Sequence, residues 1–188
     1  MNSSEIKKHL LPVLIVFVLI SVIWIINQVP FLSFVQLALG LLIGAFFLDI
    51  DHIIYWLYIN PNTEESRLAQ IALKKRDFDS IIKLIWSTQR DHINLIFHHF
   101  FFQVVLVLIS VFVFTSTSNT LAMAFLISLN IHLLVDQYED YQQNPTHLQQ
   151  WLFARESKQL PITYLGHYLG VFVILTLLLL LLLINSAL

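Results

Sequence analysis

Long runs of apolar residues, separated by shorter polar connections, dominate this chain. Each of five runs approaches or exceeds the roughly 20 helical residues that cross the hydrocarbon core of a bilayer. We therefore expect an all-α fold, a polytopic membrane helical bundle of about five transmembrane helices, with residues 1–188 forming a single membrane domain. The predicted spans are residues 10–26, 31–52, 93–114, 120–137 and 162–184.

The longest polar connection, residues 62–92, is too polar to span a membrane and too long for a simple turn. Apolar residues recur in it at approximately helical spacing between Lys, Arg and Asp residues. Asn62, followed three residues later by Glu65, is similar to a helix-capping box. These features predict amphipathic helices that lie on the lipid surface, with a second such piece starting near Thr146.

The basic residues predict the orientation of the chain. All ten Lys and Arg residues lie before the first span, between the second and third, or between the fourth and fifth. Because Lys and Arg are retained on the cytoplasmic side of membranes, we expect the N-terminus and the segment 62–92 in the cytoplasm and the C-terminus outside. The predicted location is the inner, cytoplasmic membrane.

Composition narrows the classes of function. Hydrophobic residues make up 57% of the chain and charged residues 12%, which excludes an ordinary soluble globular protein. The formal net charge of -2 provides no basic excess for nucleic acid, so membrane lipids are the expected partners. Because the chain contains no Cys, any metal ion must be bound by His, Asp or Glu.

Acidic residues and histidines gather at the predicted cytoplasmic ends of three spans. Asp49 and His52 share one helical ridge, and His132 and Asp136 share another. Asp51 lies off the first ridge, so it requires either a helix kink or an indirect role. Two adjacent histidines in the third span point about 100° apart, so which of them is the ligand stays open. The candidate metal ligands are Asp49, Asp51, His52, His98, His99, His132 and Asp136.

This set predicts a bound cation, because carboxylates in an apolar setting with almost no Lys or Arg beside them are costly. Mixed oxygen and nitrogen ligands favour zinc or manganese, or else iron, over calcium. The remaining polar residues are expected outside the site. His9 would be interfacial, His147 would lie in a loop, Asp91 would cap the third helix, and Glu139 and Asp140 would be solvated.

Three motifs carry a resemblance to a known family: Gly44-Ala-Phe-Phe-Leu-Asp-Ile-Asp-His52, His98-His99, and His132-Leu-Leu-Val-Asp136. They resemble the small bacterial inner-membrane proteins described as metal-dependent hydrolases of the LexA-binding, inner membrane-associated type. The similarity covers about residues 40–137. The first motif matches the family's Asp-x-Asp-His stretch, with Leu48 in place of a proline, and the third matches its His-x-x-x-Asp stretch.

The resemblance and the residues together predict a metal-dependent membrane hydrolase. Its ligands would activate water, and Asp51 or Asp49 would accept the proton as the catalytic base. A site near the lipid headgroups favours a lipid-like substrate with an ester or phosphoester bond. The alternative is a non-catalytic membrane protein whose metal or polar cluster is structural, or a protein that handles ions.

Overall fold

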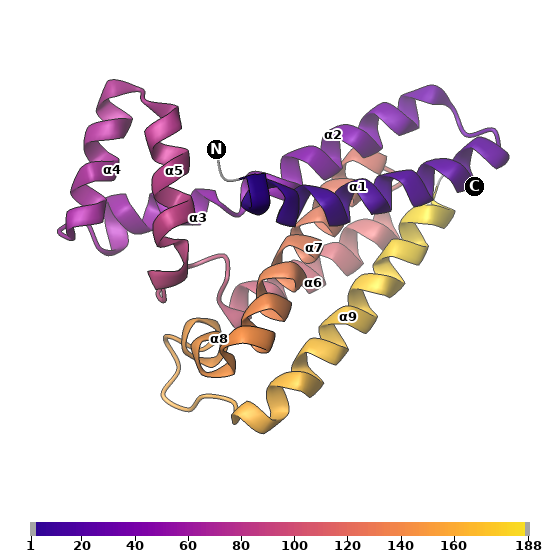
Figure 1. Ribbon diagram of the computed structural model, residues 1–188. Coiled ribbons are helices and arrows are strands. Elements are labelled where there is room, and N and C mark those ends of the chain that lie inside the picture. Colours follow the sequence, from indigo (N-terminus) through magenta and orange to yellow (C-terminus); the bar gives the residue numbers. More distant parts are fainter. Residues whose placement is uncertain (1–2, 187–188) are drawn as a thin grey trace.

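The computed structural model describes residues 3–186, with side chains described at residues 8–89 and 91–186. Within the described range every regular element is helical, which confirms the all-α prediction (Figure 1). The elements are α1 (Ser3–Ile26), α2 (Phe31–Phe47), α3 (Ile50–Ile54), the π-helical η1 (Tyr55–Ile59), α4 (Glu64–Lys75), α5 (Phe78–Thr88), the 3₁₀ turn η2 (Gln89–Asp91), α6 (Phe100–Ser116), α7 (Thr120–Gln143), α8 (Pro145–Leu152) and α9 (Ile162–Asn185).

Within residues 3–186, four helical stretches are long and apolar enough to cross a membrane. They are Lys8–Ile26, Phe31–Ile59, Thr120–Gln143 and Ile162–Asn185. The predicted third span is shorter than expected, because residues 92–99 are not helical and α6 begins only at Phe100. Its 17 residues measure about 25 Å along the axis. The helix is capped by His99 and not by Asp91, so the predicted cap was wrong.

Helix α7 is the central element of the bundle. It packs against α1, α2, α6 and α9, and its contact with α2 is the most extensive. In Figure 1 the bundle helices run side by side, while the α4–α5 hairpin stands at one end of them. Helix α7 is accordingly the most buried of the four long apolar helices, which explains how it accommodates polar residues in its middle.

Two glycines one helical turn apart allow the close contact between α2 and α7. A Cβ atom at Gly40 would lie 2.5 Å from the carbonyl oxygen of Leu121, and one at Gly44 would lie 2.5 Å from Cβ of Ser128. Small residues at this spacing let the backbones of membrane helices approach closely. The contact also lets the Ser128 hydroxyl donate to the Leu41 carbonyl at 2.7 Å. It thereby holds the next turn of α7 against the end of α2.

Helix α2 ends five residues before the predicted boundary. Around the break, Asp49, Asp51 and His52 donate their backbone N–H groups to carbonyls three residues back, as in a 3₁₀ turn, at 3.3, 2.9 and 3.2 Å. The chain then resumes as α3 and η1. The sequence required either a kink or an indirect role for one residue if Asp49, Asp51 and His52 were to serve one ion, and this tightened turn is a break of that kind.

The segment 62–92 is largely helical, as predicted, and its two helices α4 and α5 form a hairpin, although the cap differs from the predicted one. Helix α4 is capped by the Thr63 hydroxyl and not by Asn62, and Arg76 ends it in the left-handed region with φ 55°. The hairpin packs through Ala69 and Ile81 onto the aromatic residues of η1. Apolar side chains remain exposed on the hairpin: Leu68, Ile71, Phe78 and Ile82.

Candidate metal centre

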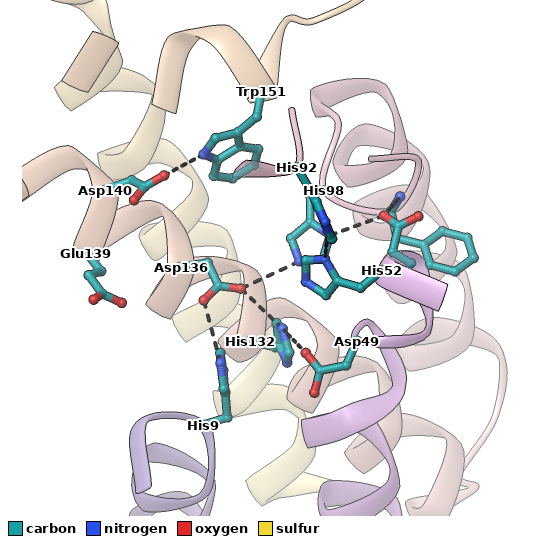
Figure 2. Close-up of polar contacts among 12 residues, drawn as sticks. His9, Asp49, His52, His92, His98, His132, Asp136, Glu139, Asp140 and Trp151 are labelled. Carbon is teal, nitrogen blue, oxygen red and sulfur yellow. Dashed lines mark hydrogen bonds and ion pairs between the residues drawn. The ribbon is translucent and has the colours of Figure 1, made fainter. Parts of the chain in front are cut away.

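The carboxylate of Asp136 on α7 is the hub of a polar cluster inside the bundle (Figure 2). Its Oδ2 atom lies 3.2 Å from Nε2 of His132 and 3.6 Å from Nε2 of His98. Its Oδ1 atom lies 3.7 Å from Nε2 of His9 and 3.1 Å from Nζ of Lys8. Side chains from α1, from α7 and from the non-helical segment before α6 therefore converge on one carboxylate.

Asp49, at the break after α2, adds a second carboxylate, with its Oδ1 atom 3.8 Å from Nε2 of His132. Most of these separations exceed a hydrogen bond, whereas ligands 2.0–2.1 Å from a tetrahedral ion lie about 3.3 Å apart. Within the described residues, His9, His132 and Asp136 offer one ligand atom each within 4.8 Å of one another. This His/His/Asp group could hold a metal ion.

Two of the histidines have a fixed ring orientation. The Nδ1 atom of His132 lies 2.8 Å from the carbonyl oxygen of Ala45, which can only accept, so His132 donates from Nδ1. The Nδ1 atom of His98 lies 3.2 Å from Oδ2 of Asp51, and a carboxylate there selects the same tautomer. Both rings then direct Nε2 toward Asp136. Histidines that bind metals are held in this way by a carbonyl or carboxylate behind the ring.

Asp51 is fully buried beside the non-helical segment that precedes α6. Besides His98, it accepts the backbone N–H groups of Ile96 at 3.0 Å and of Phe97 at 2.5 Å. The carboxylate thus fixes the non-helical segment and the ring of His98 together. This arrangement is the indirect role that the sequence left open.

His52 lies beside the centre, with its ring 5.8 Å from that of His98. Its Nδ1 atom is 2.7 Å from Nδ1 of His92, so one ring donates to the other. His92 is buried, stacks on Tyr55 at 4.0 Å, and has its Nε2 atom 3.3 Å from Oε1 of Glu65. Burial lowers the pKa of His92 to about 4, against the attraction of nearby carboxylates. A neutral His92 can therefore hold the ring of His52 in place through this hydrogen bond.

His99 has a different role from His98. Its Nδ1 atom accepts the backbone N–H of Phe101 at 3.2 Å, as the cap of α6, and its ring lies against Phe100 at 4.9 Å. Of the two adjacent histidines, His98 is the one that the structure brings to Asp136. The extended backbone at the start of α6 separates the two side chains, which the sequence treated as neighbours on one helix.

Two residues of the cluster lie outside the predicted set. His9 was expected at the interface, but it is buried and stacks on His132 with ring centroids 4.1 Å apart. Lys8 forms ion pairs with Asp136 and Glu139, so the expectation of a cluster almost without Lys or Arg was wrong. The start of α1 therefore lies at the same end of the bundle as the other groups of the cluster.

A cavity of about 60 Å³ adjoins the cluster. That volume holds a few water molecules. Its opposite wall includes Asp140, whose Oδ2 atom accepts hydrogen bonds from Nδ1 of His147 at 2.7 Å and from Nε1 of Trp151 at 2.6 Å. The predictions of a solvated Asp140 and a loop His147 were therefore wrong. His147 lies in α8, which packs against the end of α7, and both side chains line the cavity. Water can reach the cluster on this side.

Comparison with known proteins identifies no relative of this chain. No family model matches the chain, and no curated protein and no solved structure matches it. The resemblance drawn from the three motifs accordingly stays a prediction. Apolar helices of membrane type and a His/Asp group able to hold a metal ion are what the structure itself supports.

Proposed function

We propose that this protein is a metal-dependent hydrolase of the cytoplasmic membrane, which cleaves ester or phosphoester bonds of lipid-like substrates. His9, His132 and Asp136 would hold the divalent ion, with His98 and Asp49 beside them. The donor set of imidazole nitrogen and carboxylate oxygen suits zinc or manganese. The orientation predicted from the basic residues would open the site toward the cytoplasm.

One observation carries this proposal: His132 and His98 are both anchored through Nδ1, and both direct Nε2 at the same carboxylate. A buried cluster that served only for packing would not need two anchored imidazole Nε2 atoms at one point. The spacing of the atoms leaves room for an ion between them. The adjoining cavity would supply the open coordination position that distinguishes catalytic from structural metal sites.

A bound divalent ion would acidify a water molecule and stabilise negative charge on the ester. Asp49 is the best-placed base, because it lines the cavity and its side chain is about one-quarter exposed. It would take a proton from the water as the oxygen attacks the carbonyl carbon or the phosphorus. The same proton would then pass to the departing alcohol oxygen, so that one water and one ester yield an acid and an alcohol.

Lys8 favours a second candidate, a non-catalytic membrane protein with a structural polar cluster. Its ammonium group lies 3.1 Å from Asp136 and therefore already neutralises part of the charge that a metal would balance. In that case the Lys8–Asp136 pair would join α1 to α7. The two candidates differ in whether the purified protein contains metal.

The test is elemental analysis of the detergent-purified protein without a polyhistidine tag, together with hydrolysis assays on a lipid panel. We expect zinc or manganese in the parent protein and its loss in His132→Ala. His167→Ala is the matched control, because His167 on α9 is exposed. A metal-free parent from metal-replete medium would overturn the metal centre. A metal-containing parent without turnover on any ester or phosphoester lipid would overturn the hydrolase.

A further inference from the structure

A second, larger cavity lies between α5 and the junction of α2 with α3. It has a volume of about 390 Å³, within the range of small-molecule sites, and its surface is mainly apolar. We refer to it as the apolar groove. Its apolar lining comes from Phe46, Ile50, Ile53, Ile82, Ile85 and Trp86.

The apolar groove meets the metal centre at one end. His9, Asp49 and Gln89 line both the groove and the smaller polar cavity. A molecule lying in the groove would therefore extend from an apolar environment directly to the candidate ligands. This continuity of apolar and polar surface matches a molecule with a hydrocarbon chain and a polar head.

The groove also belongs to the part of the molecule that lipid would contact. Phe46 lies in the last turn of α2, within a stretch of membrane-spanning type, and its side chain is 38% exposed. Across the groove, Ile82 on α5 is 43% exposed, and Ile50 at the break is 42% exposed. Apolar walls that remain this open favour an occupant drawn from the bilayer over a water-soluble molecule.

We propose that the apolar groove holds one acyl chain of a membrane phospholipid, whose phosphate-bearing head reaches the centre at His9 and Asp49. This inference rests on the proposed function and specifies its substrate class. The divalent ion of the proposed function would provide the positive charge for the head, because Lys8 is already paired with Asp136 and Glu139. Chain length then becomes a requirement for binding, because a short-chain ester could not fill the groove and reach the centre together.

The experiment uses the full chain in nanodiscs with a phospholipid that carries a diazirine at the end of one acyl chain. After irradiation, mass spectrometry maps the labelled residues. We expect labelling in residues 46–53 and 78–88 above that of Leu177 and Leu178, which are exposed on the membrane-type helix α9 and serve as the internal reference for ordinary lipid contact. Groove labelling no higher than this reference would overturn the inference.

Variants test whether the label reports the groove itself. Ile82→Trp should fill the groove and cause the loss of most labelling in residues 46–53, while Leu68→Trp should not. Leu68 is the matched control, since it is exposed on α4 and does not line the groove. If Ile82→Trp does not fold, Ile82→Asn should weaken labelling by making the wall polar. Labelling that persists at the parent level in the folded variant would overturn the inference.

The readout separates this inference from the proposed function, because labelling requires no turnover. A labelled groove in a protein that hydrolyses no lipid would contradict only the hydrolase. Hydrolysis of lipids by a protein whose groove is not labelled would contradict only the acyl-chain site.

Discussion

Replacement of Asp51 by Asn tests whether this buried carboxylate positions the metal centre or binds the ion. Asp51→Asn keeps the shape of the side chain but removes its charge. It also places an N–H₂ group where Asp51 accepts hydrogen bonds from Ile96, Phe97 and His98. At least one charge-assisted hydrogen bond is lost. Since such a bond contributes about 1.5–3 kcal/mol, the free energy of unfolding should fall by about that amount.

The effect on metal binding should be partial. Partners behind a ligand histidine typically change metal affinity by about 10- to 100-fold, and we expect a loss in that range, because His98 is left without its anchor. The assay is competition for Zn²⁺ with a chromophoric chelator in detergent, with thermal unfolding measured on the same samples. His132→Ala provides the reference for removal of a ligand.

Glu156→Gln is the matched control. Glu156 is exposed after α8 and lines neither cavity, so its replacement should leave Zn²⁺ affinity unchanged. Two results would refute the positioning role of Asp51. Affinity and stability equal to those of the parent would mean that the carboxylate orients nothing, and a loss as complete as in His132→Ala would mean that it is a direct ligand.

Three further variants probe the packing, the charge and the pH response of the site. Gly44→Val should lower the melting temperature and the metal content together, because a Cβ atom at this position would already lie 2.5 Å from Cβ of Ser128. Such overpacking costs about 1–3 kcal/mol of stability. An unchanged melting temperature would contradict this prediction. Lys8→Met should raise Zn²⁺ affinity by removing a competing cation from Asp136, whereas lower stability with no metal uptake would indicate a structural ion pair. Because burial holds the pKa of His92 near 4, below the usual 6.5, the unfolded chain protonates first, and stability should fall as the pH drops from 6.5 to 4. His92→Gln should flatten this decline in pH-dependent unfolding measurements, and an equally steep decline in that variant would assign the titration to another group.

Much of the fold follows from hydropathy, because apolar runs of sufficient length have few alternatives to helices in lipid. The helical nature of the spans and of the α4–α5 hairpin was predictable for this reason. The start of α6 was not, since Ile93, Leu95, Ile96 and Phe97 continue the apolar run of the helix. The non-helical backbone here depends on hydrogen bonds from Ile96 and Phe97 to Asp51, and hydropathy does not report such a distant contact.

The candidate site was predictable only in part, because the sequence does not show which face of each helix points into the bundle. The spacing of His132 and Asp136 on one ridge correctly predicted their contact at 3.2 Å. The roles of Asp51 and His98 could not be separated, because they depend on the break after α2. His9 was missed because α1 is apolar on all sides, so no stripe in its sequence indicates which side of the helix faces α7.

The shortness of α6 has a consequence for the surrounding bilayer. A helix of 17 residues falls about 5 Å short of a hydrocarbon core about 30 Å thick, and such hydrophobic mismatch is relieved by local thinning of the membrane or by protein that completes the crossing. Here the non-helical stretch before α6, in which Asp51 accepts the N–H groups of Ile96 and Phe97, follows directly on the short end of the helix. If this stretch completes the crossing, the bilayer beside α6 keeps its ordinary thickness, and the polar groups of the segment, His98 among them, then lie at the depth of the lipid headgroups.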